Sequence, residues 1–179
     1  MEMSGERQIN ATRDAVWTAL NDPEILMACI PGCQEMNREG DTGFSATVKQ
    51  KVGPVSATFK GAVELSNIVP GESYTISGEG KGGAAGFAKG GADVALADHE
   101  GGTLLSYTAE AKVGGKIAQL GGRLIDGFAK KMADQFFDKF QETVGAPEEP
   151  AEEAAEAEGT EPEAEGEEKK KGWLGRIIG

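Results

Sequence analysis

Apolar and polar residues alternate with a period of two through the middle of the chain. The alternation covers residues 43–49, 55–65, 74–78, 92–96 and 103–111. Side chains at alternate positions of a strand point to opposite faces of a sheet, so each run predicts a strand with one apolar face. Glycine or proline stands between the runs, which predicts short turns and antiparallel pairing of consecutive strands. The pattern therefore predicts a meander.

The N-terminal region predicts one strand followed by two short helices. Residues 4–10 form the strand, and the segment after Thr12 carries apolar residues at helical spacing. Pro23 ends the first helix because proline disfavours the helical conformation in the residue before it. A second helix covers residues 24–28 and is broken at Pro31.

After Gly114 and Gly115 the spacing of apolar residues becomes helical for about 28 residues. The apolar stripe consists of Ile117, Leu120, Gly121, Leu124, Ile125, Phe128, Met132, Phe136 and Phe140. A helix of that length, about 42 Å, crosses the whole face of a twisted sheet. The order of elements predicts an α+β domain over residues 1–145. In it a curved antiparallel sheet of about six or seven strands wraps a long C-terminal helix, and two short helices cap the sheet.

Glycine is concentrated where this sheet would fill its core. The densest group is Gly78, Gly80, Gly82, Gly83, Gly86, Gly90 and Gly91. Glycine contributes no side chain to packing, so such a run inside strands leaves either an open space or a smooth surface on which the helix packs closely. Both alternatives remain open at this point.

A space between sheet and helix would be lined with hydrocarbon, because the large residues expected to face it are apolar. The candidate ligand-binding residues are Leu26, Met27, Ile30, Phe44, Phe59, Phe87, Leu120, Leu124 and Phe128. For Leu26, Met27 and Ile30, which belong to the two short helices and their end, a plain core role is the alternative.

Charge and composition narrow the classes of partner. The formal net charge is −12, and residues 1–145 hold 14 Lys and Arg against 19 Asp and Glu. Such a domain has no overall basic field for binding phosphates, so general nucleic-acid binding is not expected. Two cysteines and the lack of a signal-peptide pattern predict a cytoplasmic protein. No apolar run approaches the ~20 residues that span a bilayer, so membrane contact is expected to be peripheral, on the inner face.

The C-terminal region has two parts of opposite character. Residues 146–168 contain eleven Glu and no basic residue, which predicts a disordered acidic linker. Residues 169–179 form a basic-amphipathic tip, in which lysines precede an apolar face. Its candidate membrane-contact residues are Lys169, Lys170, Lys171, Trp173, Leu174, Arg176, Ile177 and Ile178. The alternative is that this tip docks on its own domain or on a partner protein.

Candidate catalytic and metal-binding groups are scarce. His99 is the only histidine and stands in a loop-like context. Cys29 and Cys33 have no further cysteine or histidine cluster to complete a zinc site, which favours reduced structural thiols. None of the predicted inward strand faces places two acids together for general acid/base work. We therefore expect no catalytic residues, no metal site and no enzymatic activity.

Four segments, in order, resemble those of the CoxG family, named for the G component of carbon monoxide dehydrogenase. They are Ile30-Pro31-Gly32-Cys33, Val52-Gly53-Pro54-Val55 through Phe59-Lys60-Gly61, Ala85-Gly86-Phe87-Ala88-Lys89-Gly90, and Leu120-Gly121-Gly122-Arg123-Leu124 followed by Phe136-Phe137. The resemblance covers about residues 1–145. It implies the helix-grip fold of the START/polyketide-cyclase (SRPBCC) superfamily, with a hydrophobic cavity between sheet and helix. It also implies association with molybdenum-containing CO dehydrogenases or related hydroxylases.

The resemblance and the residues together predict a non-enzymatic carrier. Its ligand would be a quinone such as menaquinone or ubiquinone, or another isoprenoid lipid, with no covalent cofactor. The expected partners are anionic lipid at the membrane surface and a CO-dehydrogenase-type molybdenum oxidoreductase, which the carrier would link to the quinone pool for electron transport. The alternative is a membrane-recruitment or maturation adaptor for that enzyme without ligand transport. An enzyme such as a cyclase or hydrolase, using the same cavity, is a third hypothesis.

Overall fold

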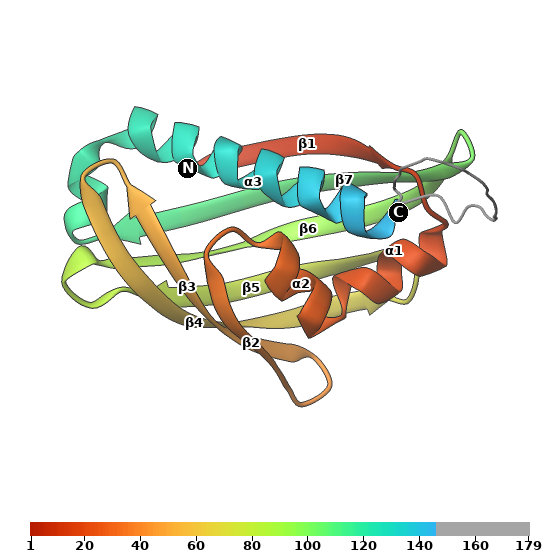
Figure 1. Ribbon diagram of the computed structural model, residues 1–179, viewed down its shortest axis with the longest axis horizontal. Helices are drawn as coiled ribbons and strands as arrows, with labels where there is room; N and C mark the ends of the chain where they lie inside the picture. Colours follow the sequence, from red (N-terminus) through yellow and green to blue (C-terminus); the bar gives the residue numbers. More distant parts are fainter. Residues whose placement is uncertain (146–179) are drawn as a thin grey trace, which may run out of the picture. The chain divides into compact units, whose positions relative to one another are not determined.

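Figure 1 shows the computed structural model, which describes residues 1–145. Seven antiparallel strands form one curved sheet in the order β1-β7-β6-β5-β4-β3-β2. The strands are β1 (Glu2–Ile9), β2 (Cys33–Glu39), β3 (Gly43–Val52), β4 (Val55–Val69), β5 (Ser73–Lys81), β6 (Phe87–His99) and β7 (Gly102–Gly114). From β2 to β7 each strand pairs with the next, and β1 pairs with β7. The predicted antiparallel meander is confirmed.

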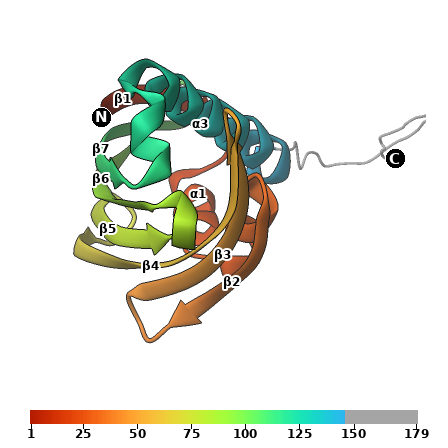
Figure 2. The same cartoon turned by 90° about the vertical axis from the view of Figure 1, so that its left-hand side faces the viewer.

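The helices lie on the concave side of the sheet, which curves around the long C-terminal helix (Figure 2). They are α1 (Arg13–Leu20), α2 (Pro23–Cys29) and α3 (Gly122–Val144), with short 3₁₀ turns η1 (Gly83–Ala85) and η2 (Lys116–Leu120). Thr12 begins α1 by accepting a hydrogen bond from the Ala15 backbone N–H at 3.2 Å. Asp22 begins α2 by accepting one from the Glu24 N–H at 2.9 Å. The predicted helix-grip α+β fold is confirmed.

The long helix begins later than the apolar spacing predicts. Residues 116–120 form η2, and Gly121, with φ of +94°, turns the chain before α3 begins at Gly122. Only glycine adopts that backbone region without strain, so the apolar spacing continues across a break that it cannot reveal. Helix α3 therefore has 23 residues, about 35 Å at 1.5 Å per residue, instead of the expected 28 or so.

Strand β2 has no counterpart among the segments predicted individually. It is an edge strand that pairs only with β3, and most of its residues are exposed. Met36 is its one large apolar side chain turned toward the interior. Without alternating apolar residues the strand has no period-two signal, because an edge strand requires fewer buried positions.

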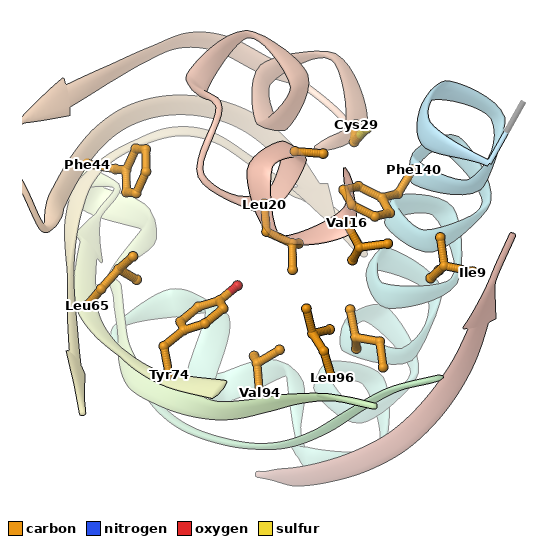
Figure 3. Close-up of a cluster of buried hydrophobic side chains, with 12 residues drawn as sticks. Ile9, Val16, Leu20, Cys29, Phe44, Leu65, Tyr74, Val94, Leu96 and Phe140 are labelled. Carbon is orange, nitrogen blue, oxygen red and sulfur yellow. The ribbon is translucent and has the colours of Figure 1, made fainter. Parts of the chain in front are cut away.

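The buried core lies where α1, α2 and the C-terminal turns of α3 meet the sheet. Figure 3 shows side chains from the sheet, from α1 and α2, and Phe140 of α3 pointing into a common interior. Phe140 is fully buried and is the only buried residue of α3. Sheet and helix thus pack directly at this end, whereas the N-terminal half of α3 is held away from the sheet.

The predicted acidic linker 146–168 and basic-amphipathic tip 169–179 lie outside the described residues, with all eight candidate membrane-contact side chains. Contacts group Met1–Val144 into one folded unit. Among the helices of residues 1–145, none is long and apolar enough to cross a membrane.

Candidate ligand-binding cavity

A cavity of about 610 Å³ lies between the concave face of the sheet and α3. A second cavity of about 530 Å³ extends beneath the N-terminal half of α3. The two adjoin, since they share the wall residues Ile30, Val48, Phe59, Ala88, Ala111, Phe136 and Phe137. Each volume is within the range of small-molecule sites, and the walls consist almost entirely of apolar side chains.

The register of the strands explains why the middle of the sheet carries no bulky side chain toward the helix. One row of paired wall residues runs through Ala46, Gly61, Gly80 and Ala88. The next runs through Val63, Gly78, Gly90 and Ala111. Of the two alternatives left by the glycine pattern, the structure has the open space, and Gly78, Gly80, Gly90 and Gly91 line it. By contrast, Gly82, Gly83 and Gly86 belong to the turn around η1 and do not line the cavity.

Glycine is also required where neighbouring strands approach closely. A Cβ atom at Gly61 would lie 2.4 Å from the carbonyl oxygen of Glu79, and one at Gly90 would lie 2.1 Å from that of Glu110. Such contacts are far shorter than real Cβ contacts. Neighbouring strands therefore approach at these positions in a way that only glycine allows.

Tyr74 supplies a polar group inside the main cavity. Its side chain is 6% exposed, and its hydroxyl points into the space enclosed by the core residues (Figure 3). No residue within 1–145 forms a hydrogen bond with this hydroxyl, and burial alone raises the pKa of Tyr74 well above its ordinary value. The group is therefore a neutral donor whose hydrogen bond is not satisfied by its surroundings, and a buried group of this kind calls for a partner.

The walls of the cavity are tied together by contacts between α3 and the edge of the sheet. Tyr107 on β7 stacks on Phe137 of α3, with ring centroids 5.5 Å apart. Arg7 on β1 lies over the same Phe137 ring at 5.1 Å and forms an ion pair with Asp134 of α3. These contacts hold the helix over the cavity without filling it.

Five of the nine predicted ligand-binding residues line the cavities. Leu26, Ile30, Phe44 and Phe59 line the main cavity, and Phe128 lines the second. Their contact with a ligand stays a prediction. The structure places the other four elsewhere.

Phe87 is on the opposite face of the sheet. It pairs with Lys81 on β5 and Gly114 on β7, while its neighbour Ala88 faces the cavity. The Phe87 side chain is 40% exposed and its ring lies over Gly114. The expectation that Phe87 faces the cavity was wrong because the strand begins at this residue, and alternation then assigns the inner face to Ala88.

Met27, Leu120 and Leu124 also lie outside the cavity walls. Met27 is on the outer side of α2 and is 39% exposed. Leu120 ends η2, so it does not share the inward face of α3. Leu124 is 41% exposed and approaches Gly53 in the β3–β4 turn. The helical period was right for α3, but Leu124 lies at the border of the inward stripe, about 100° around the helix from Ile125, which lines the second cavity.

Several wall residues were not among the candidates. They are chiefly Met36, Val48, Val63, Tyr74, Ile76, Tyr107 and Phe137. Most lie an even number of residues from Phe44 or Phe59 on the same strand, or occupy the alternating apolar positions of β5 and β7. The period-two pattern could therefore have identified them as inward-facing. Phe137 carries no such signal, because it stands next to the stripe residue Phe136.

The remaining chemically distinctive residues lie away from the cavity walls. His99 is exposed and its Nδ1 lies 2.8 Å from the Gln8 side-chain oxygen. Cys29 is buried and Cys33 half-buried, both are free thiols, and burial raises the pKa of each. Within residues 1–145, no three His, Cys, Asp or Glu residues are grouped as a metal site requires.

Comparisons with known proteins identify relatives of this domain. The family model for the G component of carbon monoxide dehydrogenase (CoxG) matches residues 5–145. A solved structure of a conserved protein from Geobacillus kaustophilus is 31% identical, with a TM-score of 0.75, over 80% of this chain and 95% of that one. A START superfamily protein from Mycobacterium smegmatis is 14% identical, with a TM-score of 0.60, over 80% and 96% of the two chains, which shows a shared fold. The search of curated proteins found no match.

Proposed function

The chain belongs to the carbon monoxide dehydrogenase CoxG family, and from this premise we propose that it is a non-enzymatic carrier of a quinone-like lipophile. Family and fold together indicate a hydrophobic-ligand-binding or CO-dehydrogenase-associated role. In the proposed role the ligand, menaquinone, ubiquinone or a related isoprenoid, is held without a covalent bond. The protein exchanges it between the membrane and a molybdenum-containing CO-dehydrogenase-type oxidoreductase.

The observation that carries this proposal is an apolar cavity into which the buried Tyr74 hydroxyl projects without a hydrogen-bond partner among residues 1–145. The Tyr74 hydroxyl in the main cavity suits a carbonyl oxygen on an otherwise apolar ring. The adjoining second cavity has Ile117, Ile125, Phe128 and Met132 in its wall, and suits a hydrocarbon tail. A quinone with an isoprenoid chain combines these two features.

Membrane association in this proposal involves the tip 169–179, with its lysines on anionic headgroups and Trp173, Leu174, Ile177 and Ile178 in the interfacial layer. Such a short segment gives weak and reversible binding, as a carrier that shuttles between membrane and enzyme requires.

Lipid extraction of the protein purified from its own host tests the carrier role. Mass spectrometry of the extract should yield a quinone in an amount comparable to the protein. Empty protein that also fails to take up menaquinone or ubiquinone from solution would contradict the proposal.

The alternative is an adaptor that recruits the oxidoreductase to the membrane or assists its maturation, for which the family match is the supporting observation. Deleting residues 169–179 would then release the enzyme from membranes, and a variant that cannot hold quinone would still recruit it. If the protein is a carrier, the variant without quinone abolishes electron transfer to the quinone pool even though the enzyme is present.

A further inference from the structure

Three segments of the chain carry basic residues and no carboxylate. Residues 49–60, 81–89 and 112–123 contain no Asp or Glu. Their basic residues are Lys49, Lys51, Lys60, Lys81, Lys89, Lys112, Lys116 and Arg123. Six Lys and Arg and all 19 Asp and Glu occupy the rest of residues 1–145. The domain is negative overall, but its basic and acidic residues are separated along the chain.

The fold brings the three segments to one end of the sheet. They contain the β3–β4 turn, the η1 turn between β5 and β6, and the passage from β7 through η2 into α3. Lys60, Lys81 and Phe87 are paired in turn across β4, β5 and β6, and η1 contacts η2. We call this the basic end; it is on the left in Figure 1 and faces the viewer in Figure 2.

The charges of the basic end are exposed and without ion-pair partners among the described residues. All eight basic side chains are solvent-exposed. The ion pairs of lysine and arginine found within residues 1–145 use other cations, namely Arg7, Arg13, Lys130 and Lys139. Glu79 is paired with Lys89 in the register of β5 and β6 without forming an ion pair to it. The local excess of cations over carboxylates attracts an anionic surface.

Two large apolar side chains stand among these cations. Phe87 is 40% exposed, with Lys81 directly opposite it on β5 and Lys89 two residues along the same face of β6. Leu124 is 41% exposed and follows Arg123 in the first turn of α3. Lysines around exposed aromatic and aliphatic side chains suit the layer where lipid headgroups meet hydrocarbon.

The interior of the same segments forms part of the second cavity. Gln50, Val52, Phe59, Ala88, Val113 and Ile117 belong to these three segments and line that cavity. The basic end is therefore the outer surface of a wall whose inner surface is apolar. A lipophilic cargo enters from a lipid phase, and this end places the wall of the second cavity directly beneath the surface that carries the cations.

We propose that the basic end docks the folded domain on an anionic membrane surface, with Phe87 and Leu124 inserted among the headgroups. This contact is separate from the tip 169–179. It sets the orientation of the cavity on the membrane, whereas a tethered tip alone leaves the orientation free. The orienting role rests on the proposed carrier function, but the docking itself follows from charge and exposure and requires no cargo.

Vesicle co-sedimentation of the full chain, without any quinone, tests the docking. The variant K81Q/K89Q/K112Q removes three charges of the basic end, and K130Q/K131Q/K139Q removes three from α3 as the matched control. On vesicles of phosphatidylcholine with about a third phosphatidylglycerol, we expect the first variant to bind at least about tenfold more weakly than wild type and the control within about twofold. The tip is unchanged in both, so it does not account for a difference.

Equal binding of the two triple variants would overturn the proposal, as would equal binding of wild type to pure phosphatidylcholine. A second measurement tests whether the side chain at position 87 enters the lipid layer. Brominated lipids should quench the tryptophan emission of F87W more strongly than that of wild type. No additional quenching would overturn the insertion of Phe87. Thermal melting of each variant verifies that the exposed substitutions leave the fold intact. A failure here leaves the quinone extraction unaffected, so the two proposals are tested separately.

Discussion

Gly61 on β4 and Gly80 on β5 are directly paired in the sheet, yet only one of them has room for a side chain. A Cβ at Gly61 would be 2.4 Å from the carbonyl oxygen of Glu79, whereas the nearest atom to a Cβ at Gly80 is 4.0 Å away. Both line the main cavity. The two glycines therefore have different roles in this sheet: Gly61 allows neighbouring strands to approach closely, and Gly80 leaves space in the cavity.

Gly61→Ala should destabilise the fold and Gly80→Ala should not. The first forces a backbone shift in β5, which costs about 1–3 kcal/mol in the free energy of unfolding. The second should change it by less than about 1 kcal/mol and in the stabilising direction, because alanine restricts the unfolded chain. Denaturant unfolding of both variants measures this, and equal effects would contradict the assignment of Gly61 to strand approach.

Tyr74→Phe should stabilise the empty protein and weaken ligand binding. The substitution removes a buried donor without a partner, which raises the free energy of unfolding by about 1 kcal/mol. It also removes the proposed hydrogen bond to a quinone carbonyl, which lowers affinity by roughly 3–10-fold. Quenching of Trp17, whose ring meets Tyr74 edge to face at 5.3 Å, reports quinone binding.

Tyr107→Phe is the control for that measurement, since Tyr107 lines the same cavity but is stacked on Phe137. If both phenylalanine variants bind quinone like wild type, Tyr74 has no orienting role.

The raised pKa of Tyr74 predicts a specific loss of stability in alkali. The folded state favours the neutral phenol, so this group contributes no pH dependence below its unfolded pKa of about 10. Above that pH the unfolded state loses its proton first, and stability falls by up to about 1.4 kcal/mol per pH unit until the folded pKa is reached. The difference in unfolding free energy between wild type and Tyr74→Phe, followed from about pH 9 upward, should show this slope.

Filling the cavity should remove ligand binding without unfolding the protein. Ala88 on β6 faces both cavities, and Ala95 on the same strand is exposed. Ala88→Leu should lower quinone uptake by at least about tenfold, at a cost to stability of about 1 kcal/mol or less, because its side chain enters existing space. Ala95→Leu, the matched control, should bind like wild type. Unchanged uptake by Ala88→Leu would show that the ligand does not occupy this space.

Phe140 and Phe128 should differ sharply in their contribution to stability. Phe140 is fully buried and stacks on Phe136 at 5.6 Å, so Phe140→Ala should cost about 3–5 kcal/mol. Phe128 lines the second cavity and is only partly buried, so Phe128→Ala should cost clearly less. Chemical denaturation compares the two, and similar losses would mean that α3 packs directly along its whole length.

Much of this protein follows from the alternation and spacing of its apolar residues. Six of the seven strands, α1, α2 and most of α3 have periodic signals, because each buries one face or one stripe of side chains. Thr12 and Pro23 locate helix ends through local chemistry. Glycines at inward positions such as Gly78 and Gly80 left two alternatives, an open space or close packing of the helix, and the structure decided for the open space.

Only the tertiary structure decided which of two alternating faces points inward, and which residues from distant segments become neighbours. It turned Phe87 outward, broke the helix at Gly121, and placed Tyr74 in the cavity with no partner for its hydroxyl among residues 1–145. It also collected cations from three separated segments at one end of a domain whose net charge is negative. Periodicity fixes which residues share a face, but pairing across strands fixes which face is buried and which charges become neighbours.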